Sequence, residues 1–224
     1  MPAFSLAALT ALDLAPPRLI DVASVCGFEK VGLRLLAATP GGISYPLMTD
    51  RSGMKETKAR MAATGIKVAD LEIVAFRPET VASSFEAFLE AGRELGARHT
   101  LVAGYDPDLS RFADRFAEYC ELADRYGLTA DLEFMPWTEV PDLNIAARIV
   151  EKVSSPAAGI LIDALHFARS GSRLEDLRKS LRGGCITGRC ATHLPSVPRR
   201  WRGSFTPHAR NACFPAKAVS ASWT

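Results

Sequence analysis

Residues 99–134 read HTLVAGYDPDLSRFADRFAEYCELADRYGLTADLEF and contain one complete strand–helix–strand unit. The largely apolar runs at 99–103 and 128–134 predict two strands. Between them, residues 109–126 have the pattern of an amphipathic helix, and Gly127 directly after it is a typical helix end. This order of elements indicates parallel strands joined by a right-handed crossover.

The same alternation continues on both sides of this unit. We expect strands at 5–9, 30–36, 66–76, 99–103, 128–134 and 158–162, and helices at 16–25, 51–63, 78–95, 109–126, 142–153 and 174–181. Six such units fit a barrel better than a doubly wound sheet, because no glycine-rich phosphate-binding motif follows the first strand. A full barrel takes about 250 residues. The sequence therefore predicts an α/β fold, a (β/α)8 TIM barrel that is incomplete, with about six β/α units in residues 1–182.

Composition excludes several classes of protein. With 224 residues, 48% hydrophobic and 23% charged, the chain is too apolar to be disordered. It has no run of about 18 apolar residues that could span a membrane, and its first residues lack the basic start of a secretory signal. The odd number of cysteines, five, favours reduced thiols. We therefore expect a cytoplasmic protein without a membrane partner.

The segment 183–224 differs from the rest and is expected to be a separate, atypical basic tail. Residues 177–224 hold nine basic and no acidic side chains, whereas residues 1–176 hold 18 basic and 25 acidic ones. The tail shows neither strand nor helix periodicity. Three interpretations are open: an out-of-frame translation product, a basic arm for nucleic acid or another polyanion, and a small zinc site. The zinc ligands would be Cys185, Cys190, His193, His208 and Cys213, although their spacing is not a common zinc-finger pattern.

Polar residues at strand ends are the best candidates for chemistry, because barrel enzymes work at the carboxyl ends of their strands. Glu133 ends one expected strand, Asp163 follows the next, and His166 comes three residues later. Two carboxylates and an imidazole suit a divalent cation. Glu72 lies within the third expected strand and Asp106 follows the fourth, but for both a helix cap or surface charge is the better interpretation.

The motifs LEFMPWT at 132–138 and IDALHFARSG at 162–171 resemble the sugar phosphate isomerase/epimerase family, whose members have xylose isomerase-like TIM barrels. The resemblance implies that Glu133 and Asp163 bind a divalent metal (Mn, Mg, Co or Zn), with Glu133 also near the proton path. It implies that His166 acts in catalysis and contacts the substrate. Arg169 would meet a substrate anion, and Trp137 would line the pocket.

The family completes its metal site with ligands from strands seven and eight, and neither is found in this sequence. We therefore expect weak metal binding, and activity of this chain itself is doubtful. The implied parent activity is metal-assisted proton transfer on a small sugar, sugar phosphate or polyol derivative, with isomerase or epimerase outcome. One alternative is an endonuclease IV-like phosphodiester hydrolase, for which His99 and His166 supply too few metal ligands. The other is a non-catalytic fragment or a protein that binds polyanions through its tail, although a nucleic-acid partner is not favoured.

A frameshift near residues 183–188 would explain both the tail and the missing ligands. Codons compatible with residues 189–194, read one base earlier, can spell Leu-Cys-Asp-Ala-Pro, which is similar to a run after strand seven in this family. A barrel that stops after six strands would leave the edges of its first and sixth strands unpaired. We therefore expect a marginally stable protein that aggregates or forms homo-oligomers.

Overall fold

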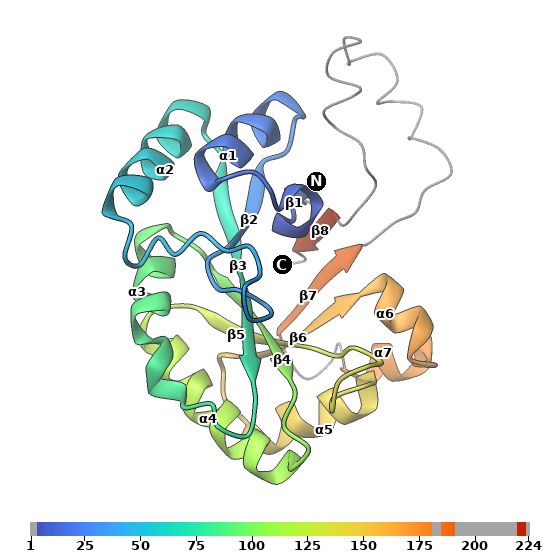
Figure 1. Cartoon of the computed structure of the whole chain (residues 1–224). Coiled ribbons are helices and arrows are strands. Elements are labelled where there is room, and N and C mark those ends of the chain that lie inside the picture. The colour runs from blue at the N-terminus through green and yellow to red at the C-terminus, as the bar shows by residue number, and fades with distance from the viewer. Residues whose placement is uncertain (1–3, 181–184, 191–218, 223–224) are drawn as a thin grey trace.

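Within the described residues, eight strands form a ring with helices on its outer side (Figure 1). The computed structural model describes residues 4–180, 185–190 and 219–222, and side chains for residues 4–177. In chain order, the strands are β1 (Phe4–Leu6), β2 (Lys30–Arg34), β3 (Lys67–Phe76), β4 (His99–Gly104), β5 (Thr129–Glu133), β6 (Ala158–Asp163), β7 (Cys185–Cys190) and β8 (Val219–Ser222). The α-helices are α1 (Pro16–Val25), α2 (Arg51–Thr64), α3 (Glu86–Glu94), α4 (Leu109–Arg125), α5 (Leu143–Val153), α6 (Ala164–Arg169) and α7 (Leu174–Ser180), and the 3-10 helices are η1 (Ala8–Ala11) and η2 (Ala82–Phe85).

The strand directions confirm an α/β TIM barrel that is incomplete at its C-terminal end. Strands β1 to β7 are parallel, each to the next. Helices follow β1 to β6 and cover the barrel from outside, as Figure 1 shows. The last strand departs from a regular (β/α)8 barrel, because β8 runs antiparallel to both β7 and β1.

Two expectations about the tail were wrong. Residues 185–190 and 219–222 form strands, so the tail is not free of regular structure. The edges of β6 and β1 are paired, with β7 and β8 respectively, and the sheet closes. The physical reason is that a strand ladder is made by backbone groups, so a segment without alternating side chains can still complete it. The cysteine–histidine zinc interpretation concerns side chains outside the described residues.

In the middle of the chain, the observed element boundaries agree closely with those predicted from the sequence. Helix α4 is the predicted helix within one residue, and Gly127 at its end has a φ of 73° that favours glycine. The first strand is shorter than expected, because the chain enters η1 two residues after Leu6. The helix expected at 78–95 is split into η2 and α3, since a turn that Thr80 closes onto Arg77 delays its start.

Side-chain alternation separates a helix-facing core from the barrel interior. Along β5, Ala130 and Leu132 belong to the apolar core beneath the helices. Asp131 and Glu133 alternate with them and therefore face the interior, where both are buried. Aromatic side chains of α4 add to the core: the rings of Phe112 and Tyr119 pack edge-on against the ring of Phe76. This packing holds α4 against β3 on the outer side of the barrel.

Among the helices that the structure describes, none combines the length and apolar character needed to cross a membrane. The expectation of reduced thiols holds for Cys120, which is free and buried. It is wrong for Cys26, which is disulfide-bonded. A cytoplasmic location remains a prediction from the sequence alone.

Candidate functional site

Glu133 and Asp163 end neighbouring strands at the same rim of the barrel. Glu133 is the last residue of β5 and pairs in register with Leu161 of β6. Asp163 lies two residues beyond Leu161, so it has the same facing as Glu133. Both acids are buried, at 4% exposed each. The rim on which they lie is the carboxyl end of the parallel strands, where the catalytic residues of TIM barrels occur.

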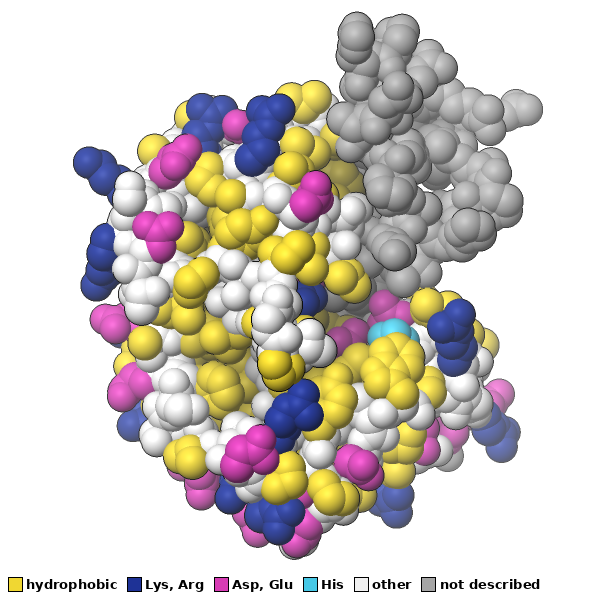
Figure 2. Space-filling view, viewed as in Figure 1, with side chains coloured by type: hydrophobic (Ala, Val, Ile, Leu, Met, Phe, Trp, Pro, Cys, Tyr) yellow, Lys and Arg dark blue, Asp and Glu magenta, His cyan; other side chains and the backbone are white. Residues whose placement is uncertain are grey.

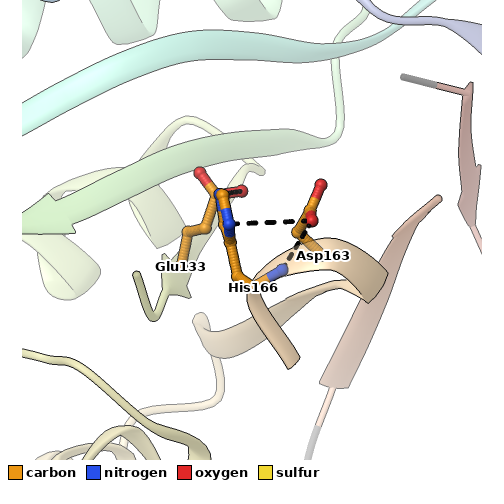
Figure 3. A group of neighbouring side chains, drawn as sticks. All are labelled: Glu133, Asp163 and His166. Carbon is orange, nitrogen blue, oxygen red and sulfur yellow. Dashed lines mark hydrogen bonds and ion pairs between the residues drawn. The ribbon is translucent and has the colours of Figure 1, made fainter. Parts of the chain in front are cut away.

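Asp163 also begins helix α6 and thereby places His166. Its Oδ1 accepts hydrogen bonds from the backbone N–H of Leu165 at 2.8 Å and of His166 at 3.0 Å. This N-cap turns the chain directly after the strand, so that the His166 side chain folds back toward the carboxylates (Figure 3). Because the cap uses Oδ1, Oδ2 of Asp163 remains the oxygen that could bind a cation.

The His166 ring lies between the two carboxylates without a close hydrogen bond to either of them. Its Nε2 is 3.9 Å from Oε1 of Glu133, and its Nδ1 is 3.8 Å from Oδ1 of Asp163. The ring of Trp137 meets the imidazole edge-on, with 4.8 Å between the centroids. Trp137 is 59% exposed and therefore forms part of the outer wall of the site. In Figure 2, acidic side chains and a histidine lie together at the edge of a recess, next to apolar side chains.

These three side chains fit a divalent cation. One ligand atom each from Glu133, Asp163 and His166 can be chosen so that all lie within 4.8 Å of one another. Three ligand atoms evenly spaced at about 2.1 Å around one cation are about 3.6 Å apart. A bound cation would therefore draw these side chains closer to one another by up to about 1 Å. Oxygen and imidazole donors suit Mn²⁺, Mg²⁺, Co²⁺ and Zn²⁺.

Arg169, the remaining predicted site residue, stands apart from this cluster. It is the last residue of α6 and is exposed. In residues 4–177, no hydrogen bond or ion pair connects its side chain to the three cluster residues. Its predicted contact with a substrate anion stays a prediction.

The expectation that Glu72 and Asp106 are helix caps or surface charges is wrong: both side chains are buried and held in ion pairs with arginines. Asp106, just after β4, accepts hydrogen bonds from Arg111 Nε at 2.8 Å and Nη2 at 2.6 Å. The Arg111 guanidinium holds the pKa of the Asp106 carboxyl below its usual value. Glu72 accepts both Nε and Nη2 of Arg34 on one oxygen. The sequence analysis missed Arg34, although it ends the apolar strand β2 just as Glu133 ends β5.

His99 is far from His166 along the barrel axis. It begins β4, at the amino end of the strands, whereas His166 follows the carboxyl end of β6. Its Nδ1 lies 2.9 Å from Thr129 Oγ1 and 3.2 Å from Asp131 Oδ2. The two histidines therefore do not share one metal cluster, which argues against the endonuclease IV-like alternative.

Sequence comparison agrees with this geometry. The profile described as a xylose isomerase-like TIM barrel matches residues 20–185, most of the chain. The chain belongs to this family. The match includes all three residues of the cluster and ends at the first residue of β7. No curated protein matches the chain.

Solved structures of similar fold include a zinc-bound protein and sugar epimerases. The IOLI protein with a binding zinc atom is 20% identical, with a TM-score of 0.66 over 84% of this chain and 73% of that one. The 3-keto-D-glucoside 4-epimerase YcjR from E. coli is 15% identical, with a TM-score of 0.67 over 85% and 78% of the two chains. The D-psicose 3-epimerase from Clostridium cellulolyticum H10, solved with D-tagatose, is 15% identical, with a TM-score of 0.66 over 89% and 77%. At these identities the likeness shows the shared xylose isomerase-like fold.

Proposed function

We propose that this barrel carries a site for metal-assisted proton transfer on a small sugar or polyol derivative, interconverting ketose and aldose or two epimers. The observation that carries the proposal is the cluster of Glu133, Asp163 and His166 at the carboxyl rim. Two neighbours of the same fold are named as sugar epimerases, and a third was solved with zinc. These names support the substrate class and the need for a cation.

Each residue of the cluster has a role that its position suggests. Glu133 and Asp163 would hold the ion, which when bound would polarise a carbonyl and its neighbouring hydroxyl and ease proton removal from the carbon between them. Glu133 borders the path of that proton. His166 donates a hydrogen bond to a substrate oxygen, and its ring is kept in place by Trp137. Trp137 offers an apolar face to the substrate, and Arg169 can meet an anionic group at the rim.

The activity is tested by incubating the full chain with free ketoses and aldoses and with added Mn²⁺, and by following product formation by NMR. We expect slow conversion that stops when EDTA removes the metal. The control is the same assay on a Glu133→Gln variant, which keeps the shape of the side chain and loses its charge. Conversion that is equal in the variant, or insensitive to EDTA, would contradict the proposal.

Metal affinity itself is expected to be weak. Three protein donors cluster among the described side chains, and the family's donors from strands seven and eight were not found in the sequence. Calorimetric titration of the full chain with MnCl₂ should therefore give a shallow isotherm. A steep isotherm that saturates at one equivalent would show that further ligands are present.

The proposal for residues 183–224 is that they replace the natural end of the barrel through a frameshift. The antiparallel direction of β8 and the absence of acidic residues after Asp176 support it. DNA sequencing across the codons for residues 182–189 tests it directly. We expect that a single-base change there restores a family-like seventh strand, and the proposal fails if none does.

A further inference from the structure

A buried ion pair lies on the inner face of the barrel, apart from the metal cluster. Arg34 Nε and Nη2 donate to the same Glu72 oxygen, at 3.1 Å and 2.6 Å. The Arg34 side chain is 9% exposed and that of Glu72 is not exposed at all. The two residues are also register partners on β2 and β3. The pair is therefore held rigidly by both backbone and side chains.

The pair faces the same central space as the cluster. Val31 and Leu33 of β2 pack in the core beneath the helices, so Arg34, which alternates with them, faces the interior. Arg34 ends β2 as Glu133 ends β5, and the ends of parallel strands share one rim. Three steps around an eight-stranded ring correspond to about 14 Å between backbones. The Arg34 and Glu133 side chains therefore enter the same central space from nearly opposite sides of the ring.

Part of the guanidinium is available to such a substrate. Of its five N–H groups, one at Nε and one at Nη2 are directed at Glu72. Within residues 4–177 the others have no hydrogen-bond partner. Arg34 Nη1 is not among the described buried atoms that lack a partner, so this nitrogen keeps some exposure to solvent.

We propose that Arg34 binds an uncharged oxygen, a hydroxyl or carbonyl, at the end of the substrate remote from the metal cluster, and that Glu72 is its positioning residue. The inference rests on the proposed function and narrows its substrate class to unphosphorylated sugars or polyols. The carboxylate of Glu72 offsets the positive charge of Arg34 and so weakens its attraction for a phosphate dianion. The N–H groups that are not directed at Glu72 can donate to one neutral acceptor, such as a hydroxyl or carbonyl oxygen.

The test measures binding of D-fructose and of D-fructose 6-phosphate to the full-length protein by ligand-observed NMR in MgCl₂, with Mn²⁺ affinity measured separately by calorimetry. We expect D-fructose to bind better than its phosphate. Arg34→Gln should weaken D-fructose binding at least about tenfold, since it removes a charged hydrogen-bond donor. Arg34→Lys keeps the positive charge but lacks the planar guanidinium with its several N–H donors, so it should give an intermediate loss of D-fructose affinity. Neither change should alter Mn²⁺ affinity more than about twofold.

Glu72→Gln provides a second, independent readout. The amide oxygen can still accept from Arg34, so the fold is kept, but the pair gains a net positive charge. We expect this variant to bind D-fructose 6-phosphate several-fold more tightly than the wild type does. The matched control is Arg111→Gln on the outer helix α4. It breaks a similar ion pair, in which two nitrogens of Arg111 donate to Asp106, and it should change the binding of neither sugar.

The outcomes separate this inference from the proposed function. Unchanged D-fructose binding in Arg34→Gln overturns the inference, as does a wild-type preference for the phosphate or a lack of D-fructose binding altogether. Sugar binding that depends on Arg34 in a protein that binds no Mn²⁺ supports the inference and refutes the metal-assisted function. Mn²⁺ binding without any effect of Arg34 leaves the metal site standing and refutes the inference.

Discussion

An Asp163→Asn variant is expected to keep its fold and to lose at least about tenfold, and up to about a hundredfold, in Mn²⁺ affinity. Asparagine is as good an N-cap as aspartate, so its side-chain oxygen can still accept from Leu165 N–H and His166 N–H. What it lacks is the negative charge that a hard divalent cation prefers. Calorimetric titration with MnCl₂ measures the loss, and thermal unfolding followed by circular dichroism measures the fold.

The matched control is Asp142→Asn, which makes the same change at the N-cap of α5. Asp142 accepts a hydrogen bond from Ile145 N–H at 2.9 Å and lies outside the metal cluster. This variant should bind Mn²⁺ as the wild type does. Asp163→Ala, by contrast, should lose both metal affinity and about 1 kcal/mol of stability, because it removes the cap as well. Equal Mn²⁺ affinity in wild type and Asp163→Asn would show that Asp163 is only a helix cap.

The closeness of Glu133 and Asp163 at one rim could be predicted because it depends on local sequence patterns. Each acid follows a short apolar run, and parallel neighbouring strands bring such positions to one rim. The same reasoning could have found Arg34, which ends β2, had the search for strand-end residues included basic side chains. Its partner Glu72 is 38 residues away, and such a contact depends on the register of β2 against β3.

Other features required long-range information that periodicity does not contain. Helix α6 is six residues long, too short for a helical period to be recognised, and its start depends on the Asp163 side chain. Strand β7 pairs with the edge of β6, and β8 pairs with the edge of β1, through backbone groups. No side-chain pattern in the sequence therefore predicts this pairing. The opposite ends at which His99 and His166 lie follow only from the strand directions.

Deleting residues 183–224 is expected to abolish cooperative unfolding and to produce aggregates. The deletion removes β7, which has five register pairs with β6, and β8, which has three with β1. At about 1 kcal/mol net per backbone hydrogen bond, this loss is comparable with the about 5–15 kcal/mol that stabilises a typical domain. It also exposes two strand edges that can pair with other molecules. Urea unfolding followed by circular dichroism and size-exclusion chromatography with light scattering measure both effects.

A control that keeps both strands distinguishes their pairing from the charge of the tail. The variant Arg199→Ser/Arg200→Ser/Arg202→Ser removes three of the nine positive charges of residues 177–224. It should unfold as the wild type does, because none of the three residues lies in β7 or β8. If the tail is instead a polyanion-binding arm, the triple variant should lose salt-dependent retention on DNA, and the deletion should remain a stable monomer. Strand pairing acts through backbone groups, so it predicts that the deletion unfolds and the triple variant does not. A polyanion-binding arm acts through its charges, so it predicts that the triple variant loses DNA retention and the deletion stays folded.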